Sequence, residues 1–165
     1  MLCIIAHWGQ KRKYTGEPYH NHPFEVYRLV KSVGANKETQ IAALLHDVVE
    51  DTLVPLHWIT TIFGAEVGVM VYRLTDVSKP SDGKRARRKK IDRVHVGCGS
   101  ANVHTVKLAD LISNSGTIVQ RDHKFAKIYM EEKRLLVNVL YRGHPELLKR
   151  ANEILDSYFN PQQRK

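Results

Sequence analysis

Residues 40–52, QIAALLHDVVEDT, place four titratable side chains directly after an apolar run: His46, Asp47, Glu50 and Asp51. On one continuous helix, positions 46 and 50 lie one turn apart, as do 47 and 51, so the four side chains would form one polar patch. Burying such a patch is costly unless a partner compensates its charge. A divalent cation that accepts imidazole and carboxylate ligands would do so, so the pattern favours a metal site over an exposed acidic face.

One helix cannot surround a cation, so further ligands must come from elsewhere in the chain. His22 directly precedes Pro23, at the expected start of a helix from which its side chain can project. Asp110 interrupts the apolar segment VKLADLI, where a solvent-facing Asp fits poorly with apolar neighbours on both sides. We therefore take both as candidate ligands. The other histidines lack such a context and are expected to be surface, capping or core residues.

Pro, Gly and capping residues divide the chain into amphipathic helices. Pro23 and Pro55 fit first-turn positions, and Asn36 fits an N-cap. Gly34 and Gly64 fit helix ends. No alternating strand pattern stands out, so we expect an all-α, single-domain fold. The domain would span residues 1–165, with a disordered tail at 160–165. The expected helices are 2–9, 23–33, 37–51, 55–63, 65–76, 101–115, 122–143 and 144–159.

Composition restricts the class of protein. A hydrophobic content of 42% is ordinary for a globular domain of 165 residues. No apolar run approaches the roughly 18 residues that a membrane span requires. Cys3 and Cys98 have no paired spacing, so neither a disulfide framework nor a thiolate metal site is expected. These features favour a cytoplasmic protein without membrane association.

The net charge of +9 is concentrated in one segment. Residues 79–90, KPSDGKRARRKK, contain seven Lys or Arg in twelve positions. Such a run is commonly a solvated helix face or loop, but it also attracts polyanions such as nucleic acid or a ligand with several phosphates. Charge alone does not choose between these interpretations. The whole stretch 79–100 is left open as loop or helix, with a helix expected from about residue 84 to 93.

Three motifs together resemble a known family. HWGQKRKYTGEPYHNHP (7–23), ALLHDVVEDT (43–52) and VKLADLISN (106–114) occur in the order and spacing of the HD-domain hydrolases of the RelA/SpoT type, and most resemble its small free-standing alarmone hydrolases. The resemblance implies an all-α fold with one bound Mn²⁺, although another divalent metal would also suit. It implies hydrolysis of guanosine 3′,5′-bis-pyrophosphate (ppGpp) and its pentaphosphate relative at the 3′ position. The metal ligands that it implies are His22, His46, Asp47 and Asp110.

The resemblance also assigns roles around the metal. Glu50 and Asp51 match the acids that accept a proton from the attacking water or orient it. The positions that would contact the nucleotide are Arg12 at the guanine, Lys13 at a phosphate, Asn114 and Thr117. The chain departs from the family at Leu111 and Gly116, where relatives often carry a basic residue. The basic run 79–90 is a hypothetical replacement for that charge.

Other functions remain open at this point. The same site would act on another nucleotide with a 2′- or 3′-phosphate, such as NADPH, or on a pyrophosphorylated tRNA end, as in an antitoxin-like enzyme. A non-catalytic module that binds nucleotides or nucleic acid is a third interpretation. The complete set of ligand-type residues disfavours this last reading, because function is argued from the site. We expect a guanine nucleotide as the partner, with RNA less favoured and the oligomeric state undetermined.

Overall fold

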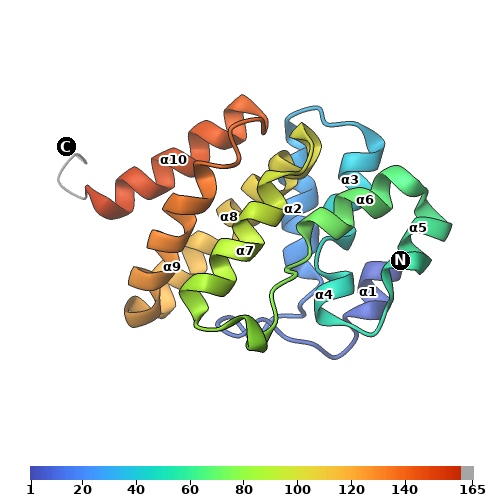
Figure 1. Cartoon of the computed structure of the whole chain (residues 1–165), viewed down its shortest axis with the longest axis horizontal. Coiled ribbons are helices and arrows are strands. Elements are labelled where there is room, and N and C mark those ends of the chain that lie inside the picture. Colours follow the sequence, from blue (N-terminus) through green and yellow to red (C-terminus); the bar gives the residue numbers. More distant parts are fainter. Residues whose placement is uncertain (161–165) are drawn as a thin grey trace.

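The structure, a computed structural model, describes residues 1–160, and helices dominate this part of the chain (Figure 1). Within the described residues no strand forms, and a single antiparallel bridge joins Lys11 to Pro18. The expected all-α fold is confirmed. The tail expected at 160–165 lies, beyond Asn160, outside the described residues. The helices are α1 (Leu2–Ala6), α2 (Asn21–Ser32), α3 (Lys37–Leu45), α4 (Val48–Asp51), α5 (Leu56–Phe63), α6 (Ala65–Leu74), α7 (Arg85–Gly97), α8 (Ala101–Arg121), α9 (His123–Val137) and α10 (Pro145–Phe159), with the 3₁₀ turn η1 at Pro80–Asp82.

Local signals in the sequence set many of the helix ends. The Asn36 side chain accepts a hydrogen bond from the Thr39 amide at 3.0 Å and caps α3. Gly34 and Gly64 adopt positive φ angles of 73° and 92° where α2 and α5 end. His144, one of the histidines expected outside the site, caps α10 by accepting from the Glu146 amide.

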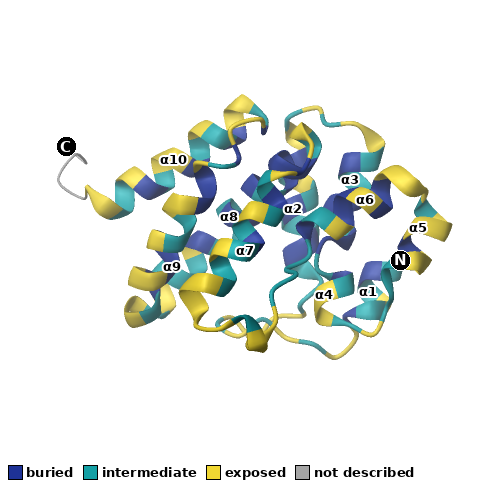
Figure 2. Ribbon diagram, in the orientation of Figure 1, coloured by how far each residue is buried: buried dark blue, intermediate teal, exposed yellow. Residues whose placement is uncertain are grey.

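The long helix α8 forms the centre of the molecule. It packs against α2, α3 and α6 on one side and against α9 and α10 on the other (Figure 1). Figure 2 shows buried residues on the faces that these helices turn toward one another. Leu108 and Leu111 of α8 are fully buried in this core, as are Val26 of α2 and Leu147 of α10. Burial against several helices fixes the position of the side chains on the inner face of α8.

The helix expected over residues 37–51 is broken at its functional end. α3 ends at Leu45, and α4 begins at Val48, with a turn at His46 and Asp47 between them. The imidazole Nδ1 of His46 bonds to the Ala43 carbonyl at 2.8 Å, and the Asp47 amide would need that carbonyl in a continued helix. The four polar side chains therefore do not share one helical face. Their proximity comes from tertiary structure instead.

Two further expectations are refined. The basic segment is helical over a longer stretch than 84–93, because α7 extends to Gly97. The helix expected over 122–143 ends earlier, at Val137, and a loop leads to α10. Among residues 1–160, the structure contains no helix with the length and hydrophobicity that a membrane span requires.

A buried carboxylate connects α7 to the segment that follows α6. Asp92, only 6% exposed, accepts hydrogen bonds from the amides of Val77 and Ser78 at 3.0 and 2.8 Å. It also accepts one from the Ser78 hydroxyl at 2.8 Å. This segment carries Asp76, which lines a cavity beside the candidate site. Asp92 therefore positions one wall of that cavity.

Replacement of Asp92 tests this connection. Asp92→Ala leaves two amides and a hydroxyl without their acceptor, so the free energy of unfolding should fall by about 2 kcal/mol. Chemical denaturation measures the change. Asp156→Ala, at an exposed position of α10, is the control and should change stability by less than about 0.5 kcal/mol. Equal stabilities of the two variants would contradict this role of Asp92.

Candidate metal centre

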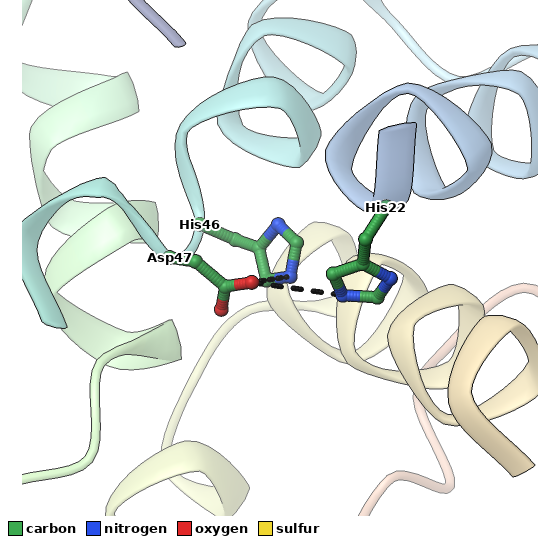
Figure 3. Close-up of side chains that lie close together, drawn as sticks. All are labelled: His22, His46 and Asp47. Atoms are coloured by element: carbon green, nitrogen blue, oxygen red, sulfur yellow. Dashed lines mark ion pairs between the residues drawn. The ribbon is translucent and has the colours of Figure 1, made fainter. Parts of the chain in front are cut away.

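Three separate elements bring four acceptor side chains together. His22 comes from the first turn of α2, His46 and Asp47 from the turn between α3 and α4, and Asp110 from α8. Asp47 Oδ2 lies 3.1 Å from His46 Nε2 and 3.6 Å from His22 Nε2. Asp110 Oδ1 lies 3.3 Å from His22 Nε2 and 4.0 Å from His46 Nε2. In Figure 3, His22, His46 and Asp47 point toward one another.

Hydrogen bonds on the outer edge of each imidazole fix its orientation. His22 Nδ1 lies 3.0 Å from the Ser113 hydroxyl, which itself donates to Glu25 at 2.6 Å. Ser113 therefore accepts from His22, so the proton of a neutral His22 is on Nδ1. The carbonyl partner of His46 assigns its proton to Nδ1 in the same way. When neutral, both histidines consequently turn an unprotonated Nε2 toward the two carboxylates.

The resulting group consists of acceptors and suits a cation. His46 is 1% exposed, and its Nε2 has no hydrogen-bond partner within residues 1–160. Two imidazole nitrogens and two carboxylates are a donor set that divalent metals accept. Without a metal, a proton on His46 would supply the positive charge among these acceptors. Burial disfavours the charged imidazole, but the Asp47 carboxylate outweighs burial and raises the pKa of His46 to about 9. The residues therefore fit a divalent cation.

Neighbouring donors hold the carboxylates in place. The Lys107 ammonium lies 3.0 Å from Asp110 Oδ2, and the Asn114 amide donates to Asp110 Oδ1 at 2.7 Å. Burial alone would raise the pKa of Asp110, but Lys107 and the two histidines hold it well below its usual range. The Tyr19 hydroxyl lies 2.7 Å from Asp47 Oδ2. Burial and Asp47 raise the pKa of Tyr19, so the phenol keeps its proton.

Tyr19 and Lys107 were not singled out from the sequence. Tyr19 lies within the motif of residues 7–23, but nothing in its spacing indicates a contact with Asp47. Lys107 precedes Asp110 by three residues on α8, which is the spacing of an intrahelical ion pair. A lysine inside an apolar helix segment was therefore an available signal.

Glu50 and Asp51 lie on α4, just beyond the cluster, and each has its own partner. Glu50 Oε2 accepts the Asp76 amide at 2.9 Å, and Asp51 Oδ2 lies 3.0 Å from the Tyr19 hydroxyl. Burial and the nearby Asp76 raise the pKa of Glu50, while burial and Asp47 raise that of Asp51. Raised carboxyl pKa values are suited to proton transfer near neutral pH.

Two cavities adjoin the cluster. The larger, about 270 Å³, is lined by Asp47, Asp110, Glu50 and Asp51, and by basic residues of α7, α8 and α9. The smaller, about 160 Å³, is lined by His22 and by all four residues expected to contact a nucleotide: Arg12, Lys13, Asn114 and Thr117. Tyr19 and Asn114 line both cavities, so the two spaces meet beside the cluster.

Only part of the basic segment faces these spaces. Arg85 and Lys89 line the larger cavity, and Arg88 lines a neighbouring pocket that also contains Glu50. Lys84 and Arg87 are exposed and line neither.

The two departures from the family pattern have little bearing on either cavity. Leu111 directly follows Asp110, and consecutive helical residues point in different directions. The Leu111 side chain is fully buried in the core. Gly116 lines a pocket against α10 rather than the candidate site. Neither position lines the two cavities beside the cluster, so the expected loss of charge near a substrate is not supported at these residues.

Curated proteins are similar in sequence to most of this chain. The chain is 30% identical over 166 aligned residues to the GTP pyrophosphokinase rsh of Brucella ovis, covering 98% of this chain and 22% of that protein. It is 33% identical over 129 residues to a GTP pyrophosphokinase of Streptomyces coelicolor, covering 78% and 14%. The chain thus spans 22% and 14% of the length of these two curated relatives.

A solved structure is similar over nearly the whole fold. It belongs to a metazoan ortholog of SpoT that hydrolyzes ppGpp and plays a role in starvation responses. The two structures superpose with a TM-score of 0.84 at 25% sequence identity, over 94% of this chain and 90% of that one. The family model of the HD domain matches residues 2–129. This chain belongs to the HD domain family, with homology to the RelA/SpoT-type proteins.

Proposed function

We propose that this chain is a metal-dependent pyrophosphohydrolase that removes the 3′-pyrophosphate of guanosine 3′,5′-bis-pyrophosphate and its pentaphosphate relative. The products would be pyrophosphate and GDP or GTP. One observation carries the proposal: an acceptor cluster suited to a cation lies where a basic cavity meets a cavity lined by the four residues expected to contact a nucleotide. The ppGpp hydrolysis described for the SpoT ortholog supports the choice of substrate.

The proposed cofactor is one Mn²⁺ ion held by His22, His46, Asp47 and Asp110. A bound divalent cation lowers the pKa of water and polarises a phosphoryl oxygen. Lys107 and Asn114 would keep Asp110 in position for this ligation, because they already bind its two oxygens. Tyr19 would keep Asp47 in position in the same way, because its hydroxyl contacts the carboxylate.

The two cavities would divide the nucleotide between them. Arg12 is held by Glu25 at 3.1 Å, and its planar guanidinium would stack on the guanine. Lys13, Asn114 and Thr117 would contact the ribose and its phosphates from the same cavity. Arg85 and Lys89 in the larger cavity would attract the remaining phosphates.

Glu50 and Asp51 would handle the proton of the reaction. Water adds to the phosphorus attached to the 3′ oxygen, the bond to that oxygen breaks, and the oxygen takes up a proton from solvent to become the 3′ hydroxyl. Glu50, whose pKa is raised by burial and by Asp76, accepts the proton that the water releases. Asp51 would orient the water together with Tyr19, whose hydroxyl contacts both Asp51 and Asp47.

Metal binding is tested by thermal unfolding. Mn²⁺ at about 100 times its dissociation constant should stabilise the protein by about 2.7 kcal/mol. For a chain of this size, that raises the melting temperature by about 5–10 °C. Asp110→Asn should abolish the shift, whereas Asp156→Asn on exposed α10 should retain it. A wild-type protein with no metal-dependent shift would contradict the metal site.

Replacement of Glu50 separates proton transfer from metal binding. Glu50→Gln should lower kcat for pyrophosphate release from ppGpp by about 10²–10⁴-fold, because the amide cannot accept a proton. Its Mn²⁺-dependent melting shift should remain. Glu66→Gln, at an exposed site on α6, should leave kcat unchanged. An active Glu50→Gln enzyme would exclude Glu50 as the base.

The basic segment is tested by two matched double variants. Arg85→Ala with Arg88→Ala removes one cation from the larger cavity and one from the neighbouring pocket, and KM for ppGpp should rise about 10-fold. Lys84→Ala with Arg87→Ala removes the same charge from exposed positions and should leave KM nearly unchanged. An equal rise in both double variants, suppressed by salt, would indicate unspecific attraction instead.

A further inference from the structure

Lys133 of α9 differs from the other lysines of the larger cavity. Its side chain lines that cavity together with Lys89 of α7 and Lys107 of α8. Lys89 is paired with Asp76, and Lys107 is paired with Asp110. Lys133 forms no ion pair with any of residues 1–160, and its ammonium lies over the Tyr129 ring, 4.8 Å from the centroid. The three-lysine cluster, Lys89, Lys107 and Lys133, therefore contains one surplus cation.

The surroundings of Lys133 compensate this charge only in part. Burial lowers the pKa of Lys133 to about 8, and Lys107 and Lys89 act in the same direction. The carboxylates of Asp110 and Asp76 oppose this but do not restore the usual pKa. A neighbouring cation of the same cavity, Arg85, is already bound to Glu132 through two hydrogen bonds of 2.7 and 2.8 Å. Lys133 lacks an anion, and the cavity in front of it has space for one.

We propose that Lys133 binds a phosphoryl group of the nucleotide and, with Lys89 and Lys107, forms an anion subsite between α7, α8 and α9. Identification of the anion as part of a nucleotide rests on the proposed function. The subsite itself rests on the unpaired ammonium in the cavity. A phosphate presents several strong acceptor oxygens and would contact lysines from all three helices at once. A purely structural Lys133, packed on Tyr129, is the competing explanation.

The test compares three variants of the full chain loaded with Mn²⁺. Lys133→Met keeps the length of the side chain and removes its charge, Lys133→Arg restores a cation, and Lys127→Met removes an exposed charge from the same helix. KM and kcat are measured with ppGpp, and the Kd of inorganic pyrophosphate is measured by calorimetry. We expect Lys133→Met to raise KM about 10-fold or more with a smaller change in kcat. Lys133→Arg should recover most of this loss, and Lys127→Met should match wild type.

The two ligands distinguish which phosphoryl group Lys133 binds. A raised KM with unchanged pyrophosphate affinity supports contact with phosphates that stay on the nucleoside. A parallel loss of pyrophosphate affinity supports contact with the departing group. Wild-type KM and wild-type pyrophosphate affinity in Lys133→Met would overturn the proposal. If ppGpp is not hydrolysed at all, the proposed function fails, and the pyrophosphate Kd alone decides on the subsite.

A footprint on the wild-type protein covers the case in which Lys133→Met does not fold. Acetylation by an amine-directed reagent, read by mass spectrometry, reports the accessibility of each lysine. Saturating pyrophosphate or ppGpp should protect Lys133 about 5-fold or more and leave exposed Lys127 unprotected. Lack of protection of Lys133 by either ligand would overturn the proposal.

Discussion

Two imidazoles and two carboxylates are buried in one cluster, and their desolvation constrains everything around them. His22 and His46 both carry their proton on the outer nitrogen, so acceptor atoms face acceptor atoms. Such a group is costly to bury unless a cation lies among it. Lys107 binds the outer oxygen of Asp110, and Tyr19 contacts Asp47 Oδ2, the oxygen that also faces the two histidines. The arrangement of these atoms suits a divalent cation.

The same constraint explains why α8 is central. A buried acid and its lysine partner need a rigid, fully packed helix to hold them one turn apart. α8 provides this, and it extends Asn114 and Thr117 into the smaller cavity from the same face. α8 therefore contributes one residue to the cluster and lines both neighbouring cavities. The acids of α4 complete the arrangement, because Glu50 lies at the edge of the larger cavity.

Much of the fold and the candidate site could be predicted from the sequence, for identifiable reasons. Helix caps and helix-ending glycines act locally, so Asn36 and Gly64 were assigned correctly. Asp110 was recognisable because an acid between apolar residues needs a partner. The break at His46 was not predictable, because the apolar pattern continues smoothly across it and a side-chain bond to the Ala43 carbonyl ends the helix.

Long-range contacts were the part that the sequence did not reveal. Tyr19 and Asp47 are 28 residues apart, and only tertiary structure brings the phenol to the carboxylate. The charge of the basic run 79–90 was evident from the sequence. Which of its side chains line the cavity and which face solvent was not. Arg85 faces the cavity while Lys84 beside it does not. Lys133 carried no motif at all, and its surplus charge emerged only from the packing of α9.

The central claim is that the buried cluster, with a divalent cation, hydrolyses the 3′-pyrophosphate of a guanine nucleotide. Phosphorus NMR of ppGpp mixed with the Mn²⁺-treated protein, followed by removal of Mn²⁺ before recording, tests it most directly. The account predicts equal amounts of pyrophosphate and GDP, and neither product when a chelator is present from the start. An unchanged ppGpp spectrum, from a protein shown to bind Mn²⁺, would contradict the account.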